Sequence, residues 1–186
     1  LDAIEAALKE EPREDHRHRI EHCCYVPPSI QDRLLELKVI DASANGFLHD
    51  LGDAYKANRG EAQMRWMWPH RTLIDRGIPA PAHSDCPVCT PNPWVGIYGL
   101  VTRKTSSGDA LFAGEGITPM EAIRAYTIDG AYSAWEEGIK GSIEPGKLAD
   151  LIVVDRDPLT IPSEELKDVR VLMTFVGGKL SFRSEA

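Results

Sequence analysis

Extended and helical segments alternate through the first 85 residues of the chain. The spacing of apolar residues predicts helices over 2–10, 29–37 and 62–77, with Ser29 as the cap of the second helix. Short apolar segments at 17–26, 38–44 and 78–85 are predicted strands, and the polar, irregular segment 45–60 is a predicted loop. This order is typical of a parallel sheet whose strands are joined by helical crossovers.

The character of the sequence changes near residue 138. Before it, a helix is predicted from Trp94 to Arg103. Another begins at Thr118, where Thr, Pro and Glu stand in the order of an N-terminal capping box. Beyond a turn-rich stretch, short β-rich segments occupy 148–155, 169–178 and 179–183. We therefore predict two domains, residues 1–138 and residues 139–186.

Chain length limits how the first domain can close. A closed (β/α)₈ barrel needs about 250 residues, and residues 1–138 supply only three or four of its βα units. Because a few parallel strands cannot close a barrel, we expect this α/β chain to be the C-terminal part of a longer protein, holding about the last three βα units of a TIM barrel.

Charge excludes some classes of partner. The chain has 21 Lys and Arg against 29 Asp and Glu, a net charge of −8, and no basic face, which argues against nucleic acid and anionic membranes. No apolar run approaches the roughly 18 residues of a membrane span, and no signal-peptide pattern is present. We therefore expect a cytoplasmic protein. This expectation uses the residues from Leu1 onward only, and a targeting signal upstream of Leu1 would change it.

The cysteines suggest a different class of protein. They stand at Cys23, Cys24, Cys86 and Cys89, and they fit free thiols in a reducing compartment. A thiol- or zinc-organised binding module centred on these four residues is the alternative to an enzyme. Adjacent cysteines on a strand point to opposite sides, however, so both can hardly serve one tetrahedral zinc site.

His22 and Asp85 each fall at the C-terminal end of a predicted parallel strand, where barrel active sites are built. Imidazole and carboxylate together suit zinc, although a surface histidine and a turn-forming aspartate would look the same in sequence. His18 and His83 share the faces of these two residues by strand alternation and are predicted to pack. The alternatives are that His18 supports a metal ligand from behind and that His83 lines the floor of the pocket. Glu21 is predicted to point away from His22 and to pair with a basic group.

Four stretches carry a family resemblance. They are RHRIEH at 17–22, SDCPV at 84–88, TPMEAIRAYTIDGAYSAWEE at 118–137 and GSIEPGKLADLIVVDRDPL at 141–159. Together they resemble the metal-dependent amidohydrolase superfamily, and within it amidohydrolase family 3, which includes N-substituted formamide deformylase-like and YtcJ-like proteins. The resemblance implies a (β/α)₈ barrel with a small β-sandwich built from both chain termini, so that residues 139–186 would form part of that sandwich.

The resemblance also assigns roles. It implies one or two divalent metal ions, usually zinc, with His22 as the sixth-strand ligand and Asp85 as the eighth-strand ligand. Asp85 would also be catalytic, taking the proton of metal-activated water and passing it to the leaving nitrogen. The H-x-H, middle-strand and fifth-strand ligands have no counterpart here and are expected upstream of Leu1. At the predicted seventh strand, Ala44-Asn45 stands where many relatives carry Gln-Pro. The wall of the active-site pocket formed by this strand is therefore expected to differ from theirs, and the resemblance does not identify the substrate.

The predicted activity is hydrolysis of a non-peptide carbon–nitrogen bond in a small amide, formamide or cyclic amide. The isolated chain is expected to be inactive, and to need the N-terminal part of the barrel or a partner subunit. A homo-oligomer is a separate expectation. A catalytically silent assembly partner is a further alternative, because unpaired sheet edges favour association.

Overall fold

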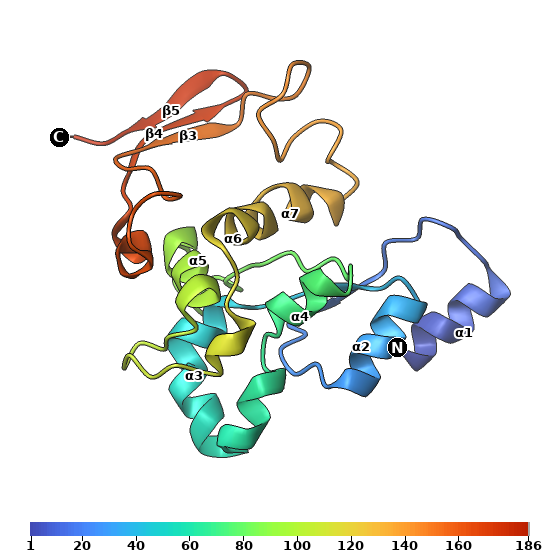
Figure 1. The fold of residues 1–186 in the computed structure, drawn as a ribbon. Coiled ribbons are helices and arrows are strands. Elements are labelled where there is room, and N and C mark those ends of the chain that lie inside the picture. Colours follow the sequence, from blue (N-terminus) through green and yellow to red (C-terminus); the bar gives the residue numbers. More distant parts are fainter. Residues whose placement is uncertain (186) are drawn as a thin grey trace.

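The computed structural model describes residues 1–185, drawn in Figure 1. The helices are α1 (Asp2–Glu10), α2 (Pro28–Glu36), α3 (Gly46–Arg59), α4 (His70–Asp75), α5 (Pro93–Thr102), α6 (Pro119–Tyr126) and α7 (Ile128–Tyr132). The strands are β1 (Arg19–Glu21), β2 (Ile40–Ala42), β3 (Leu151–Val154), β4 (Val171–Val176) and β5 (Lys179–Arg183). Short 3₁₀ segments occupy Glu61–Trp66, Ala113–Glu115 and Ser163–Asp168. No helix in this described part of the chain is long and apolar enough to cross a membrane.

Three extended segments lie side by side in parallel. β1 pairs with β2. The segment 79–83 runs along the other edge of β2, because the amide of Asp41 donates to the carbonyl of Pro79 at 3.0 Å and the amide of Ser43 donates to that of Pro81 at 3.0 Å. The predicted parallel pairing is confirmed, although the regular strands are shorter than the apolar segments that predicted them.

Helices cover one face of these segments. α2 connects β1 to β2, and α3 and α4 lie between β2 and the third segment. Leu34 of α2 and Leu73 of α4 pack in a buried cluster with apolar residues of the adjoining segments, namely Val26, Val39, Ile78 and Ala80. The predicted cap of α2 is wrong: Ser29 lies inside the helix, and Pro27 holds the cap position without a side-chain hydrogen bond. Pro28 needs no cap for its own backbone because it has no N–H to satisfy.

The predicted loop at 45–60 is wrong, since this segment forms α3. Two glycines and several polar residues lower its intrinsic helix propensity, at about 1 kcal/mol for each glycine relative to alanine. Burial of Phe47 and Leu48 contributes about 1.5–3 kcal/mol for each side chain and outweighs that cost. Gly52 is required by close packing, because a Cβ there would lie 2.6 Å from Cγ2 of Thr105.

The capping box at Thr118 is confirmed. The amide of Glu121 donates to the Thr118 hydroxyl at 3.3 Å, and the Thr118 amide donates to the Glu121 carboxylate at 2.8 Å. The predicted helix at Trp94 is also confirmed as α5, whose first turn is capped by Asn92. These helices stand between the parallel segments and the C-terminal sheet.

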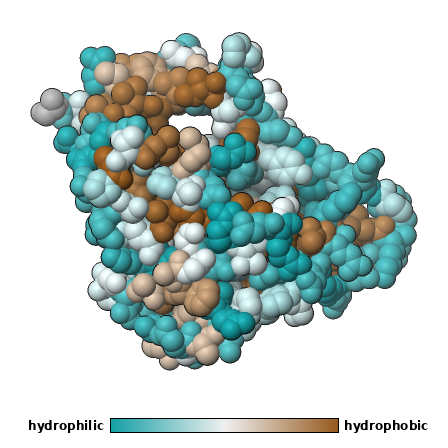
Figure 2. Space-filling view, viewed as in Figure 1, coloured by the Kyte–Doolittle hydropathy of each residue, from teal (hydrophilic) through white to brown (hydrophobic). Residues whose placement is uncertain are grey.

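The C-terminal residues form an antiparallel sheet in the order β3-β4-β5, as the β-rich segments predicted. In Figure 1 this sheet, coloured orange to red, lies across α6 and α7 from the rest of the chain. An apolar cleft between the sheet and these helices is lined by Trp94, Ile123, Tyr126, Ile152 and Phe175, among others. Figure 2 shows the brown, apolar surface of the sheet above an opening in the molecule.

Candidate metal-binding and catalytic site

His22 and Asp85 come together in the folded chain. Nε2 of His22 lies 3.1 Å from Oδ1 of Asp85. His22 follows the last residue of β1, and Asp85 follows the third extended segment, so both lie at the carboxyl edge of the parallel strands. Sequence reasoning therefore selected two residues that the fold brings into contact.

Both residues have a left-handed backbone conformation, with φ of +56° at His22 and +54° at Asp85. This conformation costs a non-glycine residue about 1–3 kcal/mol, and it persists only where surrounding contacts enforce it. Because β1 ends at Glu21, strand alternation does not set the direction of the His22 side chain. The predicted facing of His22 with His18 fails for this reason, and His18 instead stacks on His16 with ring centroids 4.7 Å apart.

Two rings hold the His22 imidazole in place. The Phe47 ring lies nearly parallel to it, with centroids 6.3 Å apart, and the His83 ring meets it edge-on at 5.4 Å. The side chains of His22 and Asp85 remain 48% and 34% exposed. A contact this accessible contributes at most about 1 kcal/mol to stability.

Glu21 contacts Arg19 and lies near His83. Its carboxylate pairs with Arg19 at 2.5 Å, which confirms the predicted basic partner. The other carboxylate oxygen of Glu21 approaches Nε2 of His83 at 3.9 Å. This approach is to His83, and the prediction that Glu21 points away from His22 stays a prediction.

The His22 and Asp85 atoms fit two positions around one metal ion. Two donors that each lie about 2.0–2.2 Å from a tetrahedral zinc ion are about 3.3–3.6 Å apart, slightly more than the 3.1 Å between these two atoms. Zinc needs three or four protein ligands. Within residues 1–185, no group of three or more His, Cys, Asp or Glu side chains is placed to hold an ion. His22 and Asp85 alone therefore fall short of the number of ligands that a zinc site needs.

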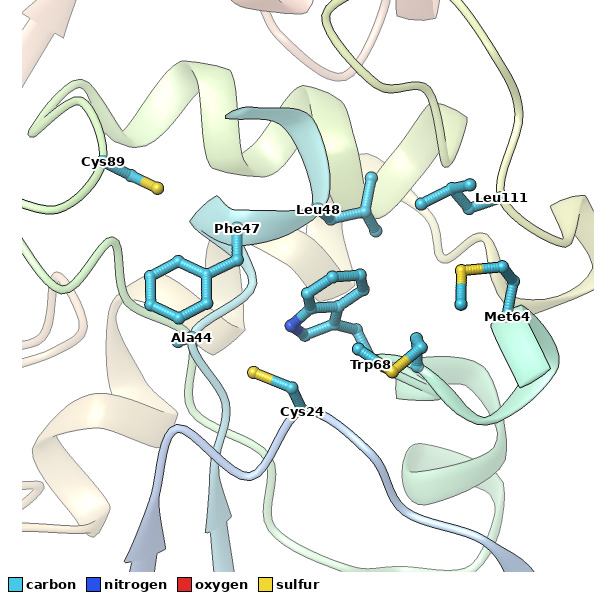
Figure 3. Close-up of a cluster of buried hydrophobic side chains, with 9 residues drawn as sticks. Cys24, Ala44, Phe47, Leu48, Met64, Trp68, Cys89 and Leu111 are labelled. Atoms are coloured by element: carbon cyan, nitrogen blue, oxygen red, sulfur yellow. The ribbon is translucent and has the colours of Figure 1, made fainter. Parts of the chain in front are cut away.

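The cysteines do not form a site. Figure 3 shows Cys24 and Cys89 among apolar side chains, with Phe47 and Trp68 in the same cluster. Burial raises the pKa of Cys24 to about 11 and that of Cys89 to about 12, and it also raises the pKa of Cys23. Since the thiolate is the metal ligand, these protonated thiols are poor candidates. The described residues thus contradict the zinc-organised cysteine module.

Asn45 is a fully buried polar residue that connects three elements of the fold through its side chain. This role was not predicted from the sequence. Its Nδ2 donates to the Gly96 carbonyl at 3.1 Å, and the Tyr126 hydroxyl donates to its Oδ1 at 3.2 Å. These bonds join the end of the β2 segment to α5 and α6. No residue pattern signals this link, because one of the two partners is the backbone carbonyl of Gly96.

Asp50 fixes the loop that follows Asp85. Its carboxylate accepts a hydrogen bond from the Thr90 amide at 3.1 Å and lies 2.8 Å from Nδ1 of His49. Burial alone would raise the pKa of Asp50, but the contacts with His49 and the Thr90 amide outweigh it and lower that pKa. Asp50 is therefore ionised at neutral pH and anchors this loop to α3.

Known proteins share this sequence and fold. A family model described as "Amidohydrolase family" matches residues 1–182. The chain is 35% identical over 184 residues to an N-substituted formamide deformylase of Arthrobacter pascens, covering 98% of this chain and 34% of that protein. It is 30% identical over 126 residues to the putative amidohydrolase YtcJ of Bacillus subtilis strain 168, covering 66% of this chain and 24% of that protein.

A crystal structure of an uncharacterised metal-dependent hydrolase from Pyrococcus horikoshii OT3 has a similar fold. Its TM-score is 0.70 at 24% identity, covering 88% of this chain and 34% of that one. The chain thus spans about a third of the length of the formamide deformylase and of this hydrolase. Since the family model covers nearly all of the chain, the protein belongs to the amidohydrolase family, in the family 3 branch that its motifs predicted.

Proposed function

We propose that this chain is part of a metal-dependent hydrolase that cleaves a non-peptide carbon–nitrogen bond in a small amide, formamide or cyclic amide. The observation that carries the proposal is the 3.1 Å approach of His22 and Asp85 at the carboxyl edge of parallel strands. Family membership and the similarity to a formamide deformylase support the bond type.

The proposed place of the chain in that enzyme is the C-terminal end. Its three parallel segments and their helices would form about the last three βα units of a TIM barrel, and residues 139–186 would form part of a β-sandwich. Within the described residues β1 has a strand partner on one side only. The barrel strands that precede this chain, or those of a partner subunit, would cover its open edge.

A divalent ion, with zinc favoured by the imidazole and carboxylate donors, would be held by His22 and Asp85 together with ligands from outside residues 1–185. When bound, such an ion lowers the pKa of a coordinated water and polarises a substrate carbonyl. The number of ions, one or two, depends on those other ligands. The free cysteines favour the reducing cytoplasm as the location.

The residues of this chain have separate tasks in the proposed reaction. Asp85 is partly exposed and adjoins Nε2 of His22, so its carboxylate can accept a proton from an attacking water and deliver it to the leaving nitrogen. Phe47 and His83 hold the His22 ring so that Nε2 faces the same point as the carboxylate. Such fixed geometry reduces the rearrangement needed during the reaction.

The variant Asp85→Asn in the full-length protein tests this function. An amide keeps the shape but cannot carry the proton, so we expect kcat to fall about 10²–10⁴-fold on whichever formamide, linear amide or cyclic amide is turned over. Chelation of the metal should abolish turnover, and the 186-residue chain alone should show none.

Cys86→Ser is the matched control, because Cys86 is the next residue and its side chain is exposed. This variant should keep wild-type turnover. Full activity of Asp85→Asn, or activity that survives complete metal removal, would contradict the proposal.

A further inference from the structure

Both ring nitrogens of His83 are engaged by neighbouring groups. Nδ1 accepts a hydrogen bond from the backbone amide of Asp85 at 3.2 Å. Nε2 lies 3.1 Å from the carbonyl oxygen of Ala42, at the end of β2. The ring therefore connects the second parallel strand to the backbone of the residue proposed to carry the proton.

These contacts define which nitrogen carries the hydrogen. The group facing Nδ1 is an N–H donor, so Nδ1 must present its lone pair. The groups facing Nε2 are acceptors, namely the Ala42 carbonyl and, at 3.9 Å, the Glu21 carboxylate. Only the tautomer with hydrogen on Nε2 satisfies both sides at once.

The main chain of His83 is fixed as well. Its amide donates to the Ser43 carbonyl at 3.2 Å, and its carbonyl accepts from the Gly46 amide at 3.2 Å. A Cβ at Gly46 would lie 2.9 Å from Cα of Ser84, so this approach requires glycine. The backbone of His83 is thus held in place at both its amide and its carbonyl, so the ring can hold the Asp85 amide in a fixed position.

Asp85 needs such an anchor because its φ of +54° is unfavourable for a residue with a side chain. Its own amide has no regular strand or helix partner, since it lies beyond the third extended segment. The hydrogen bond to His83 is the contact that holds this amide. If it were lost, the peptide could rotate and carry the carboxylate away from Nε2 of His22.

We infer that His83 is a positioning residue, whose Nδ1 holds the left-handed backbone of Asp85 by accepting its amide hydrogen bond and so aims the Asp85 carboxylate at the site. This inference rests on the proposed function of Asp85 and extends it to a residue that contacts neither substrate nor ion. The competing explanation is that the His83 ring serves only as a packing surface for His22, which it meets edge-on at 5.4 Å.

Two substitutions in the full-length protein separate these explanations. His83→Asn keeps an acceptor at the position of Nδ1 but removes the ring. His83→Phe keeps an aromatic ring against His22 but removes both hydrogen bonds. His18→Phe is the matched control, because His18 stacks on His16, away from His22 and Asp85.

The first measurement is hydrogen exchange at the Asp85 amide, without substrate or added metal. Wild type, His83→Asn and His18→Phe should exchange slowly and alike, whereas His83→Phe should exchange at least about tenfold faster because the amide loses its acceptor. The second is turnover, where His83→Phe should lose about 10–100-fold in kcat and His83→Asn should recover most of it.

Two results would overturn the inference: wild-type exchange and kcat in His83→Phe, or a loss in His83→Asn as large as that in His83→Phe. Failure of the proposed function is distinguishable, because it shows as an active Asp85→Asn variant. The exchange measurement reports the His83 contact whether or not the protein turns over an amide.

Discussion

Asp41 is a fully buried acid in the middle of β2, and neither of its carboxylate oxygens has a hydrogen-bond partner. Burial raises its pKa well above the usual range, while the nearby Cys23 thiol offsets this in part. The carboxyl group is therefore held in its neutral form over a wider pH range than an exposed Asp.

Asp41→Asn tests this effect through pH. Because the folded-state pKa is raised, the folded protein keeps a proton that the unfolded chain releases above pH 3.8, so Asp41 makes the free energy of unfolding fall as pH rises. The slope is at most about 1.4 kcal/mol per pH unit and ends at the folded-state pKa. The variant should lack this fall in denaturant titrations from pH 4 upward, and parallel pH curves for both proteins would refute the assignment.

Gly96 permits the contact between Asn45 and Tyr126. A Cβ at this position would lie 1.8 Å from the Tyr126 hydroxyl oxygen, so Gly96→Ala must displace the ring. We expect a loss of about 1–3 kcal/mol in the free energy of unfolding, as for other overpacked sites. Gly130→Ala in α7 is the control, because no atom lies within 4 Å of its added Cβ, and its stability should be unchanged or higher.

Sequence position predicted the pairing of His22 with Asp85, because parallel strands place their carboxyl ends at one edge of a sheet. It could not predict the roles of His83 or Asn45. Their partners are mostly backbone groups of Ala42, Asp85 and Gly96, and hydrogen bonds to backbone leave no residue pattern. Left-handed φ values are also invisible in a sequence where the residue is not glycine.

Local sequence patterns predicted some elements correctly and others wrongly. The cap of α6 follows from Thr118 and Glu121 alone, whereas α3 depends on apolar contacts of Phe47 and Leu48 with distant segments. A segment with weak propensity and a long-range core cannot be distinguished from a loop by its own residues. The error at 45–60 has this cause.

Thr118→Ala should destabilise α6 by removing the side-chain oxygen that accepts from the Glu121 amide. The expected loss is about 0.5–2 kcal/mol in the free energy of unfolding, measured by urea titration. Thr118→Ser retains the hydroxyl and should lose far less. Equal losses in the two variants would show that the methyl group, rather than the cap, stabilises this end of the helix.

Within residues 1–185 the C-terminal part of the chain has an exposed apolar surface. Large apolar side chains are exposed on the C-terminal sheet and the turns before it, namely Ile143, Ile152, Val176, Leu180 and Phe182. Figure 2 shows this brown surface facing the opening above the helices. Exposed patches of this kind mark surfaces that another segment covers, in agreement with the proposed place of the chain in a larger enzyme.

Anomalous X-ray scattering from crystals of the zinc-loaded, full-length protein would test the metal site most directly. We predict an ion about 2.0–2.2 Å from both Nε2 of His22 and a carboxylate oxygen of Asp85, at the mouth of a closed barrel. A zinc ion bound elsewhere, with His22 and Asp85 still in direct contact at 3.1 Å, would contradict the account.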